Sequence, residues 1–457
     1  ASSLIRKGCR IAAIKAGSSE SGSRAASSHT GAIASSDSAV DALFRKAGIV
    51  RCFSRDELTT VGCIFTLPRF TGRNIAIVTH AGGPGVMLTD ALSKGGFNVP
   101  KLDGPMAEEL KAQLFQGASV ANPIDILATG TPEQLGIAID YCEHKFEGID
   151  AIMVIFGTPG LVKLYEAYDV LHKKILECKK PIFPILPSVV TAGPEVQEFL
   201  GRGHVNFSDE VTLATALTHV LRTPAPAPAD IEIGDVDVPQ SWKIVDSIHD
   251  EGFLPPQTVR QLLGCAKIPM VPEMVSTDKA QILAFAEEIG FPVVAKVVGP
   301  VHKSDVGGVS LNIRTTRHLE EEFDRMMQIE GAKGVMVQKM LKGTELFIGA
   351  KYEPRFGHVV LCGLGGIFVE VLKDVSSGLA PLSEGECRSM IHSLRGYKII
   401  QGTRGQKGVN EEAFIKIIQR LSILLRFATQ IKEIDINPLL ANGDEVVAVD
   451  ARILFKK

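Results

Sequence analysis

Hydrophobic positions in the first two hundred residues form short apolar runs that alternate with longer stretches of helical periodicity. This alternation is typical of parallel sheets covered by helices on both faces. The sequence therefore predicts an α/β architecture for this part of the chain. The predicted strands are residues 11–15, 49–53, 74–79, 149–156 and 181–186, and the first predicted helices are residues 37–46 and 55–65.

The pattern breaks at Thr223, where a Pro-Ala repeat is followed by an acidic stretch that extends to Asp237. Neither segment can build a helix or a central strand, so we expect an extended linker at 223–239. Beyond it the sequence predicts an α+β unit. Its predicted elements are a helix at 277–289, a strand at 292–298, a β-rich stretch at 335–372 and a hairpin-like pair, 433–440 and 445–453, that turns at Asn442-Gly443.

Length and charge narrow the classes of function. A chain of 457 residues argues for roughly three domains. Its 49 Lys and Arg against 52 Asp and Glu leave a formal charge of −3, without the basic excess of a nucleic-acid binder. No apolar run approaches the ~20 residues of a membrane span, and the start has no signal-peptide pattern. We expect a cytoplasmic protein that binds neither nucleic acid nor membrane.

The eight cysteines are scattered, with no Cys-x-x-Cys pair, so we expect reduced thiols and no structural zinc. The first residue is Ala1, and an apolar run that predicts a buried strand follows almost at once. Such a strand needs neighbours. We therefore expect either a piece of a longer protein or a chain that relies on a partner.

Two segments with small residues follow predicted strands in the first half. Residues 22–33 form a loop of Gly, Ser and Ala around His29 and Gly31, which would let the backbone approach an anion; locally, a surface histidine in a Ser-rich connection is the favoured interpretation. The segment 81–85 contains Gly82, Gly83 and Gly85 between a strand and a helix, where free N–H groups and the helix dipole favour a phosphate.

A lysine inside an apolar strand marks the second half. Lys296 interrupts Val-Val-Ala-Lys-Val-Val and would need a phosphate, or an edge position from which its ammonium reaches water. A loop with His302 and the pair Gly307-Gly308 follows. The next strand, with Gln338, Lys339 and Met340, leads through Gly343 to Glu345, and segments of this kind can offer backbone groups to an adenine.

The terminal hairpin carries oxygen-bearing side chains. Alternation places Glu433, Asp435 and Asn437 on one face of their strand, and Asp450 could lie opposite. Such ligands suit magnesium, which keeps waters and nucleotide phosphates in its shell. The alternative is an acidic edge strand blunted by its charges.

Together these segments resemble the NDP-forming (ADP-forming) acyl-CoA synthetases, relatives of succinyl-CoA synthetase. Residues 28–32 are similar to the family's phosphohistidine loop, and residues 302–309 to its second histidine segment, at the start of the ATP-grasp domain. The resemblance covers essentially the whole chain. Further matches, in the family's order, are residues 81–85, 122–125, 365–370 and 435–438.

The resemblance implies flavodoxin-like CoA-ligase modules with parallel sheets and a C-terminal ATP-grasp α+β domain. The implied boundaries are 1–66 for the C-terminal part of a ligase domain with the phosphohistidine loop, 70–222 for a second ligase domain and 240–457 for the ATP-grasp domain. The family's N-terminal CoA-binding module would precede Ala1. We expect that module on a partner or on a removed segment, and an oligomer.

The implied reaction is the reversible conversion of acyl-CoA, ADP and phosphate into a small carboxylic acid, CoA and ATP, with Mg2+ as cofactor. His29 would take the phosphoryl group from an acyl phosphate, and His302 would carry it to ADP bound by Lys296, Gln338, Lys339, Met340 and Glu345, with magnesium on Asn437 and Asp450. Two alternatives stay open. One is a non-catalytic relative that senses CoA or nucleotide, and the other is a different ATP-grasp carboxylate ligase.

Overall fold

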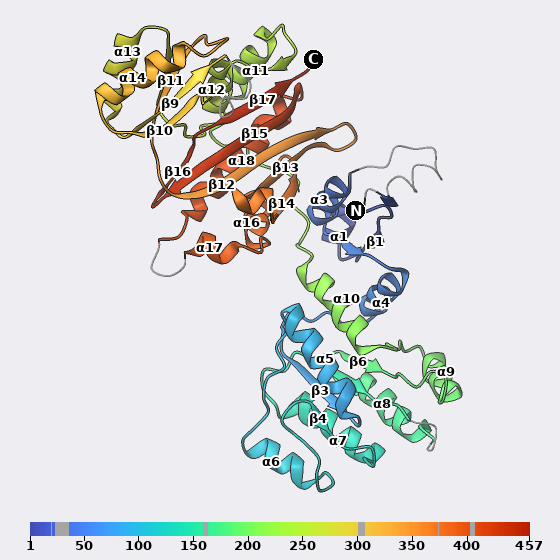
Figure 1. Ribbon diagram of the computed structural model, residues 1–457. Coiled ribbons are helices and arrows are strands. Elements are labelled where there is room, and N and C mark those ends of the chain that lie inside the picture. Colours follow the sequence, from blue (N-terminus) through green and yellow to red (C-terminus); the bar gives the residue numbers. More distant parts are fainter. Residues whose placement is uncertain (20, 23–35, 159–162, 300–306, 373, 403–406) are drawn as a thin grey trace. The chain divides into compact units, whose positions relative to one another are not determined.

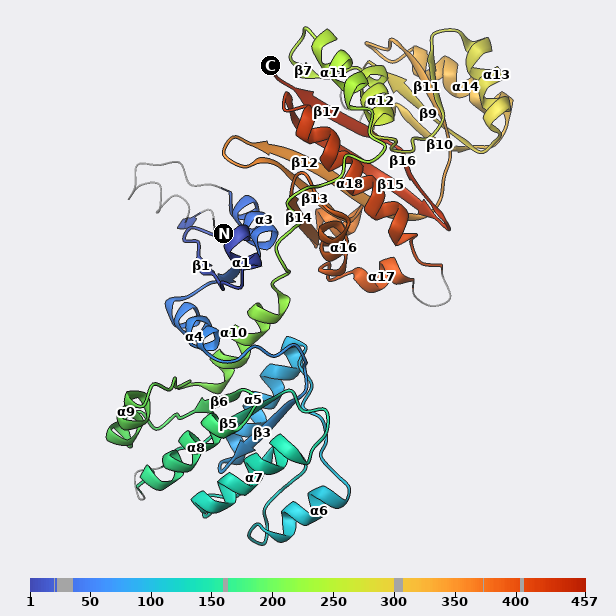
Figure 2. The ribbon, with the colours of Figure 1, turned by 180° about the vertical axis from the view of Figure 1, so that it is seen from behind.

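The computed structural model describes residues 1–19, 21–22, 36–158, 163–299, 307–372, 374–402 and 407–457. The chain folds into two units. Unit 1 comprises Ala1–Ala34 and Ala47–Pro226, and unit 2 comprises Ser35–Lys46 and Ala227–Lys457. Figures 1 and 2 show the chain from opposite sides.

Unit 1 is built around a parallel sheet with the strand order β4-β3-β5-β6. Both faces of this sheet are buried, because Ala76 and Val78 of β3 pack into one apolar cluster and Ile75 and Ile77 into another. A shorter parallel pair, β1-β2, precedes it. The elements of unit 1 are α1 (Ser2–Arg6), β1 (Ala12–Ile14), β2 (Val50–Cys52), α4 (Arg55–Thr66), β3 (Ile75–Thr79), α5 (Gly82–Gly95), α6 (Pro105–Ala112), β4 (Ile124–Asp125), α7 (Pro132–His144), β5 (Ala151–Ile155), α8 (Tyr165–Glu177), β6 (Ile182–Ile185), α9 (Gly193–Gly201) and α10 (Glu210–Arg222).

Unit 2 contains two sheets, whose strand orders over the described residues are β10-β9-β11-β8 and β14-β13-β12-β15-β17-β7, with β16 beside β15. Adjacent strands in both are antiparallel. The elements are α3 (Asp37–Ala47), α11 (Val238–Ser247), β7 (Gly252–Phe253), α12 (Pro256–Cys265), β8 (Glu273–Ser276), α13 (Lys279–Ile289), β9 (Val293–Val298), β10 (Val309–Ile313), α14 (Thr316–Met327), β11 (Gly334–Lys339), β12 (Thr344–Glu353), β13 (Gly357–Leu364), α15 (Ile367–Glu370), β14 (Val375–Leu379), α16 (Glu384–His392), α17 (Tyr397–Gln401), α18 (Glu411–Phe427), β15 (Ile431–Asn442), β16 (Glu445–Ala448) and β17 (Ala451–Phe455).

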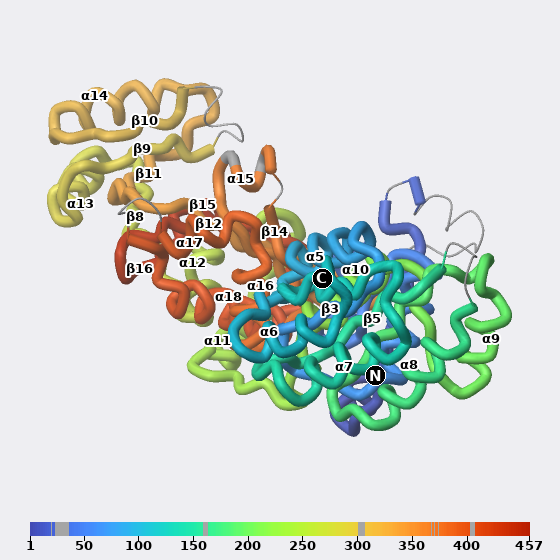
Figure 3. The backbone as a smooth tube through the Cα atoms, turned by 90° about the horizontal axis from the view of Figure 1, so that it is seen from below, coloured from blue at the N-terminus to red at the C-terminus, as the bar shows by residue number. Residues whose placement is uncertain are grey.

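Each sheet of unit 2 has a covered face. On the small sheet, α13 and α14 pack against Val293, Ala295 and Val297 of β9 (Figure 3). On the large sheet, α18 and its neighbours pack against β12, β13, β15 and β17, with Ile348 and Ile436 fully buried (Figure 1).

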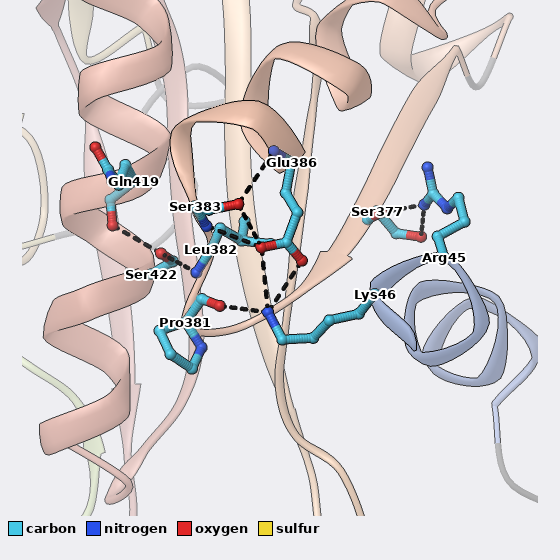
Figure 4. A network of polar contacts seen from close by, with 9 residues as sticks. All are labelled: Arg45, Lys46, Ser377, Pro381, Leu382, Ser383, Glu386, Gln419 and Ser422. Atoms are coloured by element: carbon cyan, nitrogen blue, oxygen red, sulfur yellow. Dashed lines mark hydrogen bonds and ion pairs between the residues drawn. The ribbon is translucent and has the colours of Figure 1, made fainter. Parts of the chain in front are cut away.

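The alternate residues of these strands point to the opposite faces. On the small sheet these include Lys296 and Gln338, and on the large sheet Val359 and Leu379 pack there against α3. Polar contacts at the end of α3 join it to β14 and α16 of the same unit (Figure 4).

Most elements agree with the sequence expectation, and three segments differ. The predicted strand 445–453 is divided into β16 and β17, and the predicted β-rich stretch 335–372 also contains the short helix α15. The glycine-rich segment 81–85 was expected as a turn between strand and helix, but α5 already begins at Gly82, so these glycines form its first turn. The expected linker has no helix or strand until α11 begins at Val238. In the described residues, no helix combines the length and apolar character needed to cross a membrane.

Candidate functional site

Unit 2 contains a cleft of about 300 Å³ between its two sheets. Lys296 from β9 and Gln338 from β11 line one side, and Asp450 and Arg452 from the end of the chain line the other. The remaining described lining residues are Phe253, Leu254, Pro256, Val259, Met270, Glu273, Met336, Val449 and Ala451. The cleft thus combines apolar walls with a few charged groups, a composition typical of a small-molecule site.

Lys296 reaches the cleft because of strand alternation. Its neighbours Ala295 and Val297 face the helices, so Lys296 faces the uncovered side of the small sheet. In the antiparallel register Lys296 pairs with Met336 and Val294 with Gln338, which places Gln338 on that same side. β9 lies between β10 and β11. The alternative of an edge-strand lysine is therefore excluded.

Gln338 is the most deeply buried polar side chain of the cleft, with 2% of its surface exposed. Its Nε2 donates to Glu273 Oε2 at 2.5 Å and to the Val449 carbonyl at 3.1 Å. A carboxylate only accepts hydrogen bonds, so this amide orientation is fixed. In the described part of the chain, Gln338 Oε1 has no hydrogen-bond partner, although it is buried. It is an acceptor available to a donor on a ligand.

Three other predicted nucleotide residues lie outside the cleft lining. The Lys339 ammonium donates to the carbonyls of Ile289 and Gly290 at 2.8 and 2.6 Å, which occupies it at the end of α13. Met340 donates its backbone N–H to the Pro292 carbonyl at 3.0 Å. Glu345 is exposed on β12, and a Cβ at Gly366 would lie 2.4 Å from its Oε2. The structure therefore brings Lys296 and Gln338 together without these three.

The glycine pair after the second histidine segment lies next to Lys296. The Gly308 carbonyl accepts a hydrogen bond from Val297 N–H at 2.8 Å, and Val309 pairs with Lys296 in the register. Gly307 has a φ of +66°, which favours glycine, and its carbonyl accepts from Arg325. Residues 300–306 connect β9 to β10 at this point, and His302 among them lies outside the described residues.

The predicted metal residues Asn437 and Asp450 are neighbours. Asn437 N–H donates to the Asp450 carbonyl at 3.1 Å, and only Asp450 of the two lines the cleft. β15 lies between β12 and β17, so the acidic strand is not an edge. Partial desolvation raises the pKa of Asp435, Arg452 opposite it lowers that pKa, and the carboxylates of Asp450 and Glu433 raise it.

In unit 1 the first turn of α5 offers backbone N–H groups. Gly82 and Gly83 are exposed, and no side chain caps this helix. Gly85 differs from the expectation for a phosphate ligand, because it is buried and its N–H already donates to the Ala81 carbonyl at 3.4 Å. A Cβ at Gly82 would lie 3.3 Å from Asp125 Oδ2. Gly82 and Gly83 are thus the available anion donors of this turn.

His80 precedes this turn at the carboxyl end of β3. Gly157 N–H donates to its Nε2 at 3.4 Å, so Nδ1 carries the proton and donates to the Ile155 carbonyl at 3.3 Å. The ring stacks on Phe156 with centroids 4.5 Å apart. Burial lowers the pKa of His80, although both backbone hydrogen bonds and Asp125 raise it. His80 is therefore a neutral imidazole that joins the ends of β3 and β5.

His29 and Gly31 lie outside the described residues, as His302 does. The sequence reasoning missed Glu273, which orients Gln338, and did not select Arg452, which lines the cleft. The sequence around Glu273 gives no signal of its role, because no local pattern predicts that β8 forms the edge of the small sheet. Arg452 follows Asp450 by two residues, and that spacing on a strand places both on one face.

Two family models match the chain. One describes an ATP-grasp domain and matches residues 248–455. The other describes a succinyl-CoA ligase like flavodoxin domain and matches residues 1–65. Together with the parallel sheets of unit 1 and the two antiparallel sheets of unit 2, they confirm the expected fold class, which combines parallel α/β sheets, a flavodoxin-like ligase domain and a C-terminal ATP-grasp domain.

The relatives agree with these models. The chain is 31% identical over 471 residues, 97% of its length, to acetate–CoA ligase [ADP-forming] I of Archaeoglobus fulgidus, of which it spans 66%. It is 41% identical over 206 residues to the beta subunit of acetate–CoA ligase [ADP-forming] I of Pyrococcus furiosus, of which it covers 89%. It is also 42% identical over 123 residues to the alpha subunit of the second such ligase of that organism.

The chain is also similar to a solved structure, dinucleotide forming acetyl-coenzyme A synthetase 1 of Ca. Korarchaeum cryptofilum in complex with coenzyme A, Ca-AMPCP and HgCl+. The two are 35% identical, the match covers 45% of this chain and 94% of that chain, and the TM-score is 0.43.

The combined domains define a protein of the succinyl-CoA ligase and ATP-grasp class. Within that class, the chain belongs to the family of ADP-forming acyl-CoA ligases, which confirms the resemblance found in its motifs.

Proposed function

We propose that this chain carries the phosphoryl-transfer part of an ADP-forming acyl-CoA ligase. The reaction would interconvert acyl-CoA, ADP and phosphate with a small carboxylic acid, CoA and ATP. The observation that supports it best is the cleft of unit 2, where Lys296, the unpartnered Oε1 of Gln338 and Asp450 lie around one space of about 300 Å³. In that space the Lys296 ammonium could bind a phosphate, and Gln338 Oε1 could accept a hydrogen bond from the nucleotide's base.

In this proposal Lys296 binds a nucleotide phosphate through its ammonium. The lysine lies on an otherwise apolar strand, half-buried, where a charge-assisted hydrogen bond is stronger than in water. Gln338 Oε1 would accept from an N–H of the base, and Glu273 would hold the amide in that orientation. The apolar wall from Phe253 to Val259 gives the ring a surface to pack on.

Magnesium is the metal that the family resemblance implies, and the side chains fit it. Asn437 and Asp450 offer an amide and a carboxylate oxygen from adjacent backbone positions. The described residues contain no cluster of three or more His, Cys, Asp and Glu side chains suited to a metal. A magnesium ion that keeps waters and phosphate oxygens needs only one or two protein ligands. When bound, it would neutralise phosphate charge.

The phosphoryl group would travel as a phosphohistidine. Inorganic phosphate attacks the thioester, releasing CoA and forming an acyl phosphate. A neutral imidazole nitrogen of His29 attacks phosphorus, the P–O bond to the acyl oxygen breaks, the carboxylate leaves and the ring N–H proton goes to solvent. Gly82 and Gly83 would hold phosphate oxygens by their N–H groups. His302 would take the group and pass it to ADP.

CoA would be bound with the help of a further module. Relatives of this chain include proteins named as separate alpha and beta subunits. We therefore propose that the chain acts with a CoA-binding module, on the same polypeptide or on a partner subunit. Measuring the native mass alone and after mixing with that module tests this step.

Labelling with γ-32P-ATP and magnesium tests the phosphoryl transfer. ATP and a neutral histidine give ADP, phosphohistidine and a proton, so we expect label that is acid-labile and base-stable. The His29→Ala variant should lack one labelled site, and His302→Ala should lose label at both sites. Lys296→Met should weaken nucleotide binding at least tenfold, through loss of a charge-assisted hydrogen bond, whereas Lys279→Met, which removes a surface ion pair with Asp324, should not.

Absence of label from a protein that binds nucleotide would contradict the proposed function and favour a nucleotide sensor. Label on His29 at the wild-type rate in His302→Ala would contradict the relay alone. Retention of nucleotide affinity in Lys296→Met would show that the cleft is not the nucleotide site.

A further inference from the structure

Unit 1 contains a cavity of about 430 Å³ at the amino ends of its strands. Arg10 and Ile11 directly precede β1, and Gly48 precedes β2. The remaining walls come from the end of α4, the connection that follows it and the end of α10; the two helices lie side by side in Figures 1 and 2. The first turn of α5 follows the carboxyl end of β3 instead. The cavity is therefore separate from the anion donors Gly82 and Gly83.

The walls of the cavity are mostly apolar, and four aromatic rings stand out among them. These are Phe65, Phe70, Phe97 and Phe183. The Phe70 ring lies edge-on to Phe183 with centroids 5.9 Å apart, and tilted against Phe97 with centroids 6.4 Å apart. A further ring would gain from such neighbours beyond the area that it buries. An apolar cavity of about 150 Å³ already holds a benzene molecule, so this cavity has room for a ring that carries a short side chain.

Two arginines supply the charge at this cavity, and none of its described lining residues is acidic. Arg10 donates to the carbonyls of Ile64 and Leu67, each at 3.3 Å. Arg69 donates to the Gly8 carbonyl at 3.0 Å. Burial and the charge of Arg69 both lower the pKa of Arg10. The two guanidinium groups therefore repel each other, and an anion bound beside both would offset that repulsion.

Both arginines keep donors for such an anion. A guanidinium carries five N–H donors. Over the described residues, the hydrogen bonds of Arg10 use one N–H on each of its two terminal nitrogens, and those of Arg69 use one. A carboxylate is the anion that matches a guanidinium fork, because its two oxygens accept two parallel N–H bonds. The cavity thus pairs a carboxylate-binding end with aromatic walls.

We infer that this cavity of unit 1 binds an aromatic carboxylic acid, with its ring among the four phenylalanines and its carboxylate on Arg10 and Arg69. The site does not depend on the proposed function, because it lies at the opposite ends of the strands from α5. The ligand would contact the start of β1, the connection at 68–72 and residues 223–226 after α10 at the same time. Its binding therefore stabilises unit 1.

Calorimetric titration of the full chain with 3-phenylpropionate tests the inference, and we expect one molecule bound per chain. Two comparison ligands separate the contributions. The neutral 3-phenylpropanamide keeps the ring and loses the charge-assisted hydrogen bonds, and propionate keeps the charge and loses the buried ring. Each should bind at least tenfold more weakly than 3-phenylpropionate.

Two variants assign the binding to the cavity. Arg69→Met replaces an exposed side chain, and Val220→Phe puts a larger side chain of α10 into the space of the ligand. Each should weaken binding of 3-phenylpropionate at least tenfold. Arg73→Met is the matched control, because Arg73 is exposed on the same connection and does not line the cavity. Its affinity should stay within twofold of wild type.

Cys9 gives a local readout, because it is exposed and lines the cavity. Saturating 3-phenylpropionate should slow its alkylation by iodoacetamide at least threefold, as measured by mass spectrometry. Cys63 is the control, since it does not line this cavity and should react at an unchanged rate. Absence of binding, equal affinity in wild type, Arg69→Met and Val220→Phe, or unchanged alkylation of Cys9 in the bound protein would each overturn the inference.

Discussion

At the scale of single residues, His80 links protonation to stability. Burial lowers its pKa in the folded chain, so the unfolded chain binds this proton more readily. The stability that the neutral ring contributes is complete above its ordinary pKa of 6.5 and is lost as the pH falls through the folded-state value. Protonation of Nε2 would also remove the acceptor used by Gly157 N–H.

We expect the free energy of unfolding of unit 1 to fall between pH 7.5 and pH 5.5, and to fall more in wild type than in His80→Asn, because asparagine does not titrate. Urea midpoints at the two pH values measure this. Other histidines contribute equally to both proteins, so the difference between them isolates His80. An equal loss of unfolding free energy in the two proteins would mean that the pKa of His80 is the same in the folded and the unfolded chain.

Lys296 is a site residue that the sequence alone identifies as a candidate. A lysine within Val-Val-Ala-Lys-Val-Val is conspicuous in the sequence, because burial of its ammonium without a partner costs free energy. Glu273 is not conspicuous, since its role depends on a hydrogen bond to Gln338, which lies 65 positions away. The Lys339 ammonium donates to the carbonyls of Ile289 and Gly290, and the prediction that its backbone lies at the nucleotide stays a prediction.

At the scale of elements, the cap of α7 illustrates how local sequence sets a helix boundary. Thr131 Oγ1 accepts from Gln134 N–H, and Gln134 Oε1 accepts from Thr131 N–H. Thr131→Ala removes half of this capping box and should destabilise unit 1 by about 1 kcal/mol. Urea denaturation followed by circular dichroism measures the change.

The matched control is Thr215→Ala in α10, where an exposed hydroxyl donates to the Val211 carbonyl within the helix. That hydroxyl caps no helix end, so its removal should change the free energy of unfolding by less than about 0.5 kcal/mol. A loss of equal size in both variants would show that the box at Thr131 contributes no more than an ordinary surface hydroxyl.

The local sequence predicts that helix α3 forms, but it does not predict where that helix packs. The periodicity of residues 37–46 predicts a helix with one apolar face, and α3 is present at Asp37–Ala47. The pattern does not say what covers that face. Its partners, Val359 and Leu379, lie beyond the linker, and only long-range packing pairs them with Ala39 and Ala42.

At the scale of the whole molecule, the two units should respond differently to ligand. A nucleotide that binds only the cleft of unit 2 stabilises that unit by about 2.7 kcal/mol at a hundredfold excess over its Kd. Thermal unfolding with Mg-ADP should therefore move the transition of unit 2 upward and leave that of unit 1 in place. Limited proteolysis at each temperature, with fragments identified by mass, assigns the transitions.

Lys296→Met serves as the control, because its weaker binding should reduce the shift at the same nucleotide concentration. An equal upward shift of both transitions would contradict a nucleotide site confined to unit 2. It would mean that the units unfold together or that unit 1 also binds the nucleotide.

The sequence by itself determined the order and type of most elements, since apolar periodicity, caps and glycines act over a few residues. It also marked Lys296 and the oxygen-bearing pair Asn437 and Asp450 as unusual. Tertiary structure alone decided that β9 and β15 are internal strands, that Gly85 is a packing position, and that α3 lies on the sheet of unit 2. The physical reason is that strand pairing and face-to-face packing join residues far apart in the chain, whose meeting no local pattern records.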